Sequence, residues 1–282
     1  MRRTRTFPVL AGSVLLATGA AILVPTAAQA AVACNESALV AAVTTANLAG
    51  GGNIVLSTGC TYTITTSHGS DADGPDALPV ITTAVTLTGD NNTITRSTAP
   101  GTPAFRIVKV AAGGGLTVKG NVTLSHGSAA TDGGGILNRG AVTLTASALT
   151  GNSATGRGGG LANADIAAPA LGATATFTSS SVSGNNAGGR GGGIYNGLRG
   201  SLTTTSSSLV GANTSGAQGG GIAAVDSTAT TLTSTQVSAN GATAAGGIYR
   251  QNGTMTLTTS PVSGNTPNNC VTSSPAVPGC VG

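Results

Sequence analysis

The chain has 282 residues, of which 45 are glycine, and only 7% of its residues are charged and 2% aromatic. Soluble domains usually carry about 25% charged residues, so this composition excludes a coiled coil, a typical nucleic-acid-binding domain and a charge-rich disordered tail. Glycine does not recur at every third position, which excludes collagen. The composition therefore favours one long fold built from small side chains.

Residues 1–30 have the pattern of a secretory signal peptide. Arg2, Arg3 and Arg5 precede an apolar run from Val9 to Val24, and Ala28–Ala30 provides a small-x-small cleavage site. We expect export with removal of this segment, which leaves a mature chain without a transmembrane span. The net charge of +4 then falls to near +1, because three of the twelve basic residues are lost and nine remain against eight acids. No strongly anionic partner and no nucleic acid is predicted.

All four cysteines lie in the mature part, two near each end: Cys34, Cys60, Cys270 and Cys280. Export makes disulfides the expected state. Pairing of sequence neighbours, Cys34 with Cys60 and Cys270 with Cys280, is the simplest of three possible connectivities. No histidine lies close to them at a zinc-site spacing, so no metal is predicted there.

An internal repeat organises the second half of the chain. A Gly-Gly-aliphatic box occurs five times, with its aliphatic residue at Ile136, Leu161, Ile194, Ile222 and Ile248. Each box is followed by a second one, and the second boxes align as Leu149–Asn152, Val182–Asn185, Leu209–Ala212, Val237–Asn240 and Val262–Asn265. Successive boxes of both sets lie about 25 to 33 residues apart. The chain therefore contains a repeat of this length.

Each repeat contains an alternating segment such as Val142–Thr145 or Met255–Thr258, which predicts a β-strand with apolar residues inward and threonine outward. No helical pattern separates these segments. A unit of this length cannot bury its own apolar face and must stack on its neighbours. The sequence therefore predicts an all-β solenoid, with roughly ten rungs in residues 31–282 and the most regular repeats in residues 133–270.

Two other patterns fit this solenoid. Asparagines recur in two registers, one containing Asn138, Asn163 and Asn196 and the other Asn152, Asn185, Asn240 and Asn265, and stacked asparagines can hydrogen-bond along the axis. Residues 35–50 predict a short helix, capped by Asn35 or Ser37, that covers the N-terminal end of the stack.

The repeat boxes resemble those of polymorphic outer-membrane-protein-type chains, with leucine or valine where that family often has phenylalanine. Ala41–Ile64, and Leu78–Ile81 leading to Val85–Leu87, are similar to secreted bacterial right-handed parallel β-helix proteins of the pectate-lyase-like superfold. This resemblance implies a right-handed parallel β-helix and a bacterial source. It implies little about activity, because the same scaffold carries lyases, hydrolases, adhesins and structural proteins.

An enzyme of this superfold would need clustered carboxylates. The acids of this chain are Glu36, Asp71, Asp73, Asp76, Asp90, Asp132, Asp165 and Asp226. No pair of them can be placed across one glycosidic bond, so the catalytic residues, if any, are unknown. Asp71, Asp73 and Asp76 lie close enough in sequence to hold calcium, although a polar turn set by Gly74 and Pro75 is the favoured interpretation.

A column of polar residues lies four positions before each aliphatic residue and contains Asp132, Arg157 and Arg190, followed by Gln218 and Ala244. Registered rungs would make Asp132 and Arg157 neighbours, and pairing of their charges is one interpretation. The other is a small basic cleft, with Arg139, Arg199 and Arg250 nearby, that contacts sugar carboxylates or phosphates.

The outward strand positions form a threonine array: Thr143, Thr145, Thr176, Thr178, Thr203, Thr205, Thr231, Thr233, Thr256 and Thr258. Ser147, Ser180, Ser207, Thr235 and Ser260 are expected to extend this array by one column. Flat threonine arrays resemble those of ice-binding solenoids, but strand propensity alone also favours threonine. A hydroxyl-rich face that contacts polysaccharide and a plain solvated sheet are the other interpretations.

Taken together, the sequence predicts a secreted or cell-surface, non-catalytic solenoid that contacts glycans or mediates adhesion, without a cofactor and as a monomer. The competing hypothesis is a polysaccharide lyase or glycoside hydrolase of the pectate-lyase-like superfold, and an ice-binding protein is a third. An exposed cluster of carboxylates would favour the enzyme.

Overall fold

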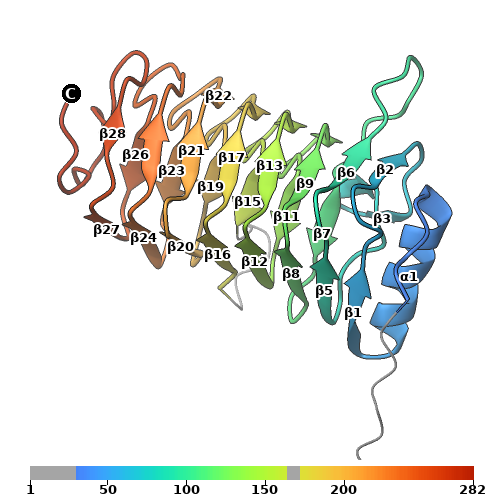
Figure 1. Cartoon of the computed structure of the whole chain (residues 1–282). Helices are drawn as coiled ribbons and strands as arrows, with labels where there is room; N and C mark the ends of the chain where they lie inside the picture. The colour runs from blue at the N-terminus through green and yellow to red at the C-terminus, as the bar shows by residue number, and fades with distance from the viewer. Residues whose placement is uncertain (1–29, 164–171) are drawn as a thin grey trace, which may run out of the picture.

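The computed structural model describes residues 30–163 and 172–282. The predicted signal peptide therefore lies outside the described residues, except for Ala30. From Gly51 onward the chain winds into a parallel β-solenoid, with one helix at its N-terminal end (Figure 1). Within the described ranges, no helix combines the length and apolar character needed to span a lipid bilayer.

Two parallel sheets run along the whole stack. The first, called the threonine sheet here, contains β1 (Gly51–Val55), β5 (Ala84–Thr88), β8 (Gly115–Lys119), β12 (Ala141–Thr145), β16 (Thr174–Thr178), β20 (Ser201–Thr205), β24 (Ala229–Thr233) and β27 (Thr254–Thr258). The second eight-stranded sheet contains β2 (Thr61–Ile64), β6 (Asn92–Arg96), β9 (Val122–Ser125), β13 (Ala148–Thr150), β17 (Ser181–Ser183), β21 (Leu209–Gly211), β25 (Gln236–Ser238) and β28 (Val262–Ser263).

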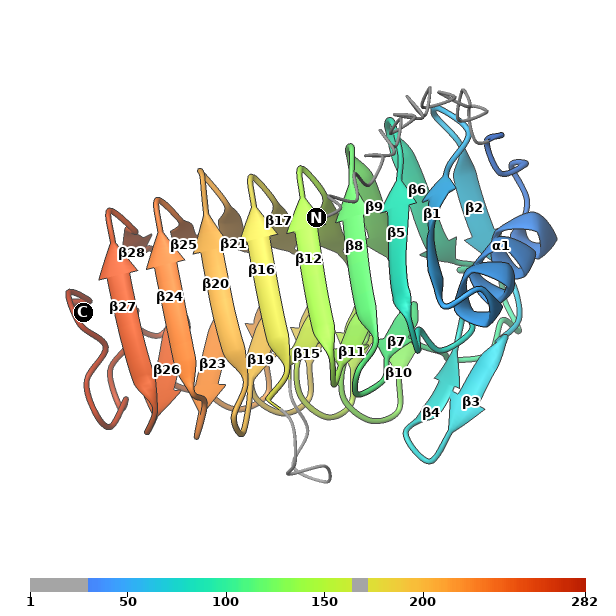
Figure 2. The ribbon, with the colours of Figure 1, turned by 90° about the horizontal axis from the view of Figure 1, so that it is seen from below.

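Shorter sheets complete each turn. The six-stranded sheet contains β7 (Val108–Val110), β11 (Ile136–Asn138), β15 (Leu161–Asn163), β19 (Ile194–Asn196), β23 (Ile222–Val225) and β26 (Ile248–Gln251). A four-stranded sheet contains β10 (Ser128–Ala129), β14 (Ser153–Ala154), β18 (Asn186–Ala187) and β22 (Thr214–Ser215). Near the N-terminal end, β3 (Gly69–Asp71) and β4 (Gly74–Asp76) form an antiparallel hairpin beside the stack (Figure 2).

The solenoid has fewer turns than the roughly ten expected from the sequence. Eight strands in the threonine sheet enclose seven full turns. Gly51 and Thr254 occupy the same register position seven turns apart, so a turn averages (254 − 51)/7 = 29 residues rather than 25. The helix, the hairpin and the C-terminal segment use further residues outside the regular turns.

Strand pairing confirms the repeat read from the Gly-Gly-aliphatic boxes. Ile136, Leu161, Ile194, Ile222 and Ile248 pair in one unbroken column. The second box is misaligned at one place: Val210, not Leu209, pairs with Val182, so Asn213 rather than Ala212 occupies the asparagine position. The preceding corner holds two left-handed residues, Ser206 and Ser207, where the neighbouring turns have one. This extra residue causes the shift.

The glycine boxes are required by the close approach of neighbouring turns. A Cβ on Gly135 would lie 2.6 Å from the carbonyl oxygen of Gly160 and 2.9 Å from the side-chain amide nitrogen of Asn152. The glycine two positions earlier, Gly133, instead has a φ of +69°, a left-handed conformation that glycine adopts without steric cost. Close stacking and a left-handed corner therefore account for different glycines of the same run.

The core is a narrow column filled by one or two inward side chains per strand, such as Leu144, Phe177 and Leu232, each at most 1% exposed. Both asparagine registers lie buried inside this column. Asn138 donates to Asn163 at 2.8 Å, and Asn163 donates to Asn196 at 2.7 Å. The second ladder runs without a break through Asn152, Asn185, Asn213, Asn240 and Asn265, with amide-to-amide distances of 2.9 to 3.0 Å. The predicted structural role of these residues is confirmed.

The helix α1 (Glu36–Leu48) covers the N-terminal end of the core, as the sequence predicts. Asn35 is its N-cap and accepts a hydrogen bond from the Ala38 amide at 2.9 Å. Leu39, Val43 and Ala46 are buried on its inner face. The disulfide between Cys34 and Cys60 joins the segment before the helix to the first turn.

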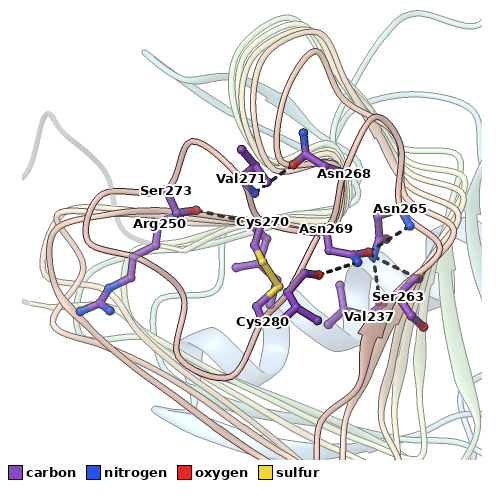
Figure 3. The surroundings of a disulfide bond; sticks show 12 residues. Val237, Arg250, Ser263, Asn265, Asn268, Asn269, Cys270, Val271, Ser273 and Cys280 are labelled. Atoms are coloured by element: carbon purple, nitrogen blue, oxygen red, sulfur yellow. Dashed lines mark hydrogen bonds between the residues drawn. A yellow bond between two sulfur atoms is a disulfide. The ribbon is translucent and has the colours of Figure 1, made fainter.

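The C-terminal end is covered by a loop closed by the Cys270–Cys280 disulfide (Figure 3). Asn269, next to this disulfide, continues the asparagine ladder, since Asn265 donates to its side-chain oxygen at 3.0 Å. Asn269 in turn donates to the Val281 carbonyl at 2.9 Å. Both disulfides follow the simplest of the three connectivities.

Candidate functional site

The ten predicted threonines occupy two outward columns on the threonine sheet, whose strands β12, β16, β20, β24 and β27 lie side by side in Figure 2. The first column pairs Thr143, Thr176, Thr203, Thr231 and Thr256 in register, and the second contains Thr145, Thr178, Thr205, Thr233 and Thr258. All ten are half-buried or exposed. Adjacent rungs of a parallel sheet lie about 4.8 Å apart. The array is therefore a regular, uncharged surface of hydroxyl and methyl groups across five adjacent strands.

The array also extends toward the N-terminal end. Thr86 and Thr117 continue the first column, and Thr88 belongs to the second. Lys119 interrupts the second column between Thr88 and Thr145. The uninterrupted paired surface therefore begins at β12 and ends at β27.

The expected third column of outward hydroxyl groups is wrong at three of its five positions, which point into the core, whereas Ser207 is exposed and Ser260 is half-buried. Ser147, Ser180 and Thr235 are at most 5% exposed. The Ser180 hydroxyl accepts the Ser147 amide at 3.2 Å, and the Ser208 hydroxyl accepts the Ser180 amide at 3.2 Å. Simple alternation fails here because each corner contains a left-handed residue, and the corner after β20 contains two, so the side on which the next residue lies is reversed.

That corner forms a shallow furrow along the solenoid, called the corner groove here. It consists of two depressions of about 300 and 310 Å³ that share Ser207 and Leu209. The first is lined by Asn121, Ala146, Ser147, Ala148, Ser179, Ser180, Ser181, Ser207 and Leu209, and the second by Ser207, Ser208, Leu209, Ser234, Gln236, Thr259 and Pro261. This groove was not predicted, although serine runs at 179–181 and 206–208 precede two of the second boxes.

The predicted polar column is in register. Its first two members, Asp132 and Arg157, form a charge pair, whereas Arg190 pairs with no acidic residue of the described ranges. The Arg157 guanidinium pairs with the Asp132 carboxylate, and the Arg157 amide donates to the same carboxylate at 2.7 Å. Its guanidinium also lies 4.6 Å from the centre of the Tyr195 ring. Burial lowers the pKa of Arg157, but the hydrogen bond and charge of Asp132 outweigh it and raise the pKa above its ordinary value. Burial raises the pKa of Tyr195, with Arg157 opposing it.

Arg190 has neutral partners instead. It donates to the side-chain oxygens of Gln218 at 2.7 Å and Gln251 at 3.2 Å, and it lies 5.1 Å from the centre of the Tyr249 ring. Arg139 and Arg250, expected near this column, have partners elsewhere. Arg139 pairs with Asp73 at 2.6 Å, whereas Arg250 donates to the carbonyl oxygen of Ala276 at 3.0 Å and to that of Gly253.

The three aspartates of the proposed calcium segment lie on or beside the β3–β4 hairpin and each contacts a basic side chain. Asp71 and Asp73 both pair with Lys109, which is 3% exposed. Asp76 is fully buried and pairs with the buried Arg106 at 2.5 Å. Burial raises the pKa of Asp76 to about 6, against the opposing charge of Arg106. Calcium binding stays a sequence-based prediction; the described residues contain no group of three or more histidine, cysteine, aspartate or glutamate side chains placed for a metal.

The roles of Lys109 and Arg106 were missed by the sequence analysis. The two residues flank the start of β7, and their carboxylate partners come from a hairpin more than 29 residues earlier. A long-range insertion of this kind leaves no periodic signal.

Comparison of the chain with protein-family models, with curated proteins and with solved structures finds no match.

Proposed function

We propose that the protein is an exported, non-catalytic binding protein that contacts glycans at or near a cell surface, with the threonine sheet as a contact surface. The observation that carries the proposal is the paired threonine array, which keeps its register over five adjacent strands without a charged residue. A repeated hydroxyl surface suits a ligand that itself presents repeated hydroxyl groups. The two disulfides are consistent with an extracellular location.

The competing enzyme hypothesis is less well supported by the arrangement of the carboxylates. Asp71, Asp73, Asp76 and Asp132 are each engaged by an arginine or lysine. Glycoside hydrolysis needs two carboxylates across one bond. The bacterial source and the place in the pectate-lyase-like superfold remain part of the proposal, supported by the repeat boxes and the parallel stack.

Ice binding is a second candidate that uses the same surface. The specific observation in its favour is that the threonine pairs repeat at the constant rung spacing of a parallel sheet. A flat, regular array is suited to a crystalline surface, whereas a flexible polysaccharide does not require such regularity. The two functions differ in the ligand and can be separated by direct measurement.

The first experiment measures binding of the mature protein to a panel of soluble neutral and acidic polysaccharides by affinity electrophoresis, together with thermal hysteresis and the release of reducing ends. A Thr203→Tyr variant projects a large ring from the middle of the array. We expect it to weaken glycan binding about tenfold, equivalent to about 1.4 kcal/mol.

The matched control is Thr150→Tyr, because Thr150 is a half-buried, outward residue of the second eight-stranded sheet. Equal loss in both variants would contradict a role for the threonine sheet. Thermal hysteresis that disappears only in Thr203→Tyr would replace glycan contact by ice binding. Time-dependent cleavage of any polysaccharide would overturn the non-catalytic proposal.

A further inference from the structure

We propose that the corner groove binds one extended chain of a neutral polysaccharide, with the polymer axis parallel to the solenoid axis. This inference rests on the proposed glycan-binding function but adds a second site and a ligand class. The groove lies between the threonine sheet and the second eight-stranded sheet, at the corners that lead from β8, β12, β16, β20, β24 and β27 into the strands that follow them.

The absence of charge in the groove selects against charged ligands. None of the residues that line its two depressions is acidic or basic. Proteins that bind polyanions neutralise them with lysine and arginine, and planar arginine groups are the usual partners of carboxylates and phosphates. A nucleic acid or a uronic-acid polymer would therefore lose the hydration of its charges without gaining a partner.

The groove can instead supply hydrogen bonds to hydroxyl groups. Ser179, Ser207, Ser234 and Thr259 are exposed in the groove, and a hydroxyl can both donate and accept. The Ser234 and Thr259 hydroxyls hydrogen-bond each other at 3.0 Å, which uses one donor of that pair. Gln236 adds an amide whose nitrogen donates one hydrogen bond to the Ser238 hydroxyl at 3.1 Å and whose second N–H and oxygen have no hydrogen-bond partner among the described residues. Leu209, where the two depressions meet, offers an apolar contact. Mixed hydroxyl, amide and small apolar contacts match the surface of an uncharged sugar, which alternates hydroxyl groups with C–H groups.

A polypeptide cannot add to this corner as a β-strand, because the backbone is already paired between turns. The Ala146 amide donates to the Thr178 carbonyl at 3.0 Å, and the Ser234 amide donates to the Thr258 carbonyl at 2.9 Å. Strand addition requires an edge with free N–H and C=O groups. Recognition in the groove therefore depends on side chains, which recur at every turn.

The repetition fixes the direction and length of the ligand. Equivalent corner residues lie one rung apart, about 4.8 Å along the axis. The lining residues from Asn121 to Pro261 come from six consecutive corners, and five rung spacings of about 4.8 Å make the groove about 24 Å long. A polymer of similar units lying along the axis can repeat its contacts from turn to turn, whereas a single sugar would use only a small part of the groove.

The test uses a pair of variants on one strand. Ser181 and Ser183 are both half-buried, outward residues of β17, but only Ser181 lines the groove. The probes are hydroxyethylcellulose, arabinoxylan and galactomannan as neutral polymers and polygalacturonate as an acidic one. We expect Ser181→Trp to fill the groove and weaken binding of at least one neutral polymer tenfold or more, with Ser183→Trp unchanged.

A second pair of variants tests the charge argument. Gln236→Glu and Gln236→Lys should both weaken binding of the neutral polymer, because each buries a charge against an uncharged ligand. If the wild-type protein binds only polygalacturonate, or if Gln236→Lys strengthens binding, the neutral ligand is wrong although glycan binding stands. If Ser181→Trp binds as well as Ser183→Trp, the groove is not the site. If no polysaccharide binds, both this inference and the proposed function are overturned.

Discussion

Two regions of the solenoid hold their turns together by different interactions. The first region contains the turns up to Asp132, and the later region extends from Gly133 to Asn265. Six of the eight acidic residues precede Gly133. In this first region, ion pairs attach the β3–β4 hairpin to β7 and its surroundings, and the pair of Asp76 with Arg106 is fully buried. In the later region, neutral asparagine ladders and glycine boxes repeat from turn to turn. The difference shows that irregular turns are held by ion pairs specific to one place, whereas regular turns can repeat the same asparagine and glycine interactions.

The two regions should also differ in how much stability a single substitution removes. An ion pair is made by two residues, and removing one leaves the other charged and buried. A ladder is made by a column in which each residue bonds to the next, so a single deletion removes ladder bonds only of the two adjacent members, and these keep their bonds to other groups. The largest effect of a single substitution is therefore expected in the first region.

Arg106→Gln should destabilise the protein by about 3–5 kcal/mol, because it leaves the buried Asp76 carboxylate without its cation. Arg106 also donates to the carbonyl oxygens of Gly133 and Asp132 and to the Thr131 hydroxyl, and these bonds are weakened as well. Urea denaturation followed by circular dichroism measures the change. Arg190→Gln is the matched control, since Arg190 is half-buried with neutral partners, and it should cost no more than about 1 kcal/mol. Similar losses in both variants would contradict the special role of the buried pair.

Asn185→Ala should cost about 2–4 kcal/mol in the middle of the ladder. The Asn185 side chain accepts the Asn152 amide at 2.9 Å and donates to the Leu149 carbonyl at 3.0 Å and to Asn213. Its removal leaves several buried polar groups without a partner, at about 1–3 kcal/mol each before relaxation. The neighbouring Asn186, which is exposed, provides the control as Asn186→Ala. A loss for Asn185→Ala within 0.5 kcal/mol of the control would show that water replaces the ladder.

The later region was predictable in detail because the same contacts recur at the same positions of each turn. The Gly-Gly-aliphatic boxes, the inward side chains and most of the asparagine ladder follow from residue spacing alone. The sequence repeat assigned Ala212 to the ladder position that Asn213 occupies. This error arose because the preceding corner has an extra residue, Ser206 or Ser207, and a regular repeat does not show such an insertion. The buried serine column was missed for a related reason, since one left-handed residue breaks the two-residue alternation of a strand.

The first region was less predictable because its important contacts are not periodic. Helix α1 was found from its cap and apolar face, which are local signals. The pairing of Asp76 with Arg106, or of Asp73 with Arg139, joins residues 30 and 66 positions apart through a hairpin that occurs once. The corner groove likewise depends on how successive corners pack, not on any residue type that binds ligands by itself.

The smallest expected effect is the change of stability with pH. Two carboxyl groups of the first region, Glu36 and Asp76, are expected to change stability in opposite directions. Burial alone would raise the pKa of Glu36, but hydrogen bonds from His68, Thr65 and Thr66 outweigh it and lower the pKa to about 2, from 4.5. Glu36 therefore contributes stability above pH 4.5, and this contribution is lost as the pH falls toward 2. Asp76 behaves oppositely: its pKa of about 6 lies above 3.8, so the folded state holds the proton more tightly and stability decreases as the pH rises from about 4 to 6.

Urea denaturation of the wild type, Glu36→Gln and Asp76→Asn between pH 3 and 7 tests both signs. The stability difference between the wild type and Asp76→Asn should grow in favour of the wild type as the pH falls from 6 to 4, because only the wild type takes up the extra proton. The difference between the wild type and Glu36→Gln should shrink below pH 4.5. If both differences stay constant over these ranges, the two carboxyl groups do not titrate as their surroundings require, and the first region is held by packing rather than by charge.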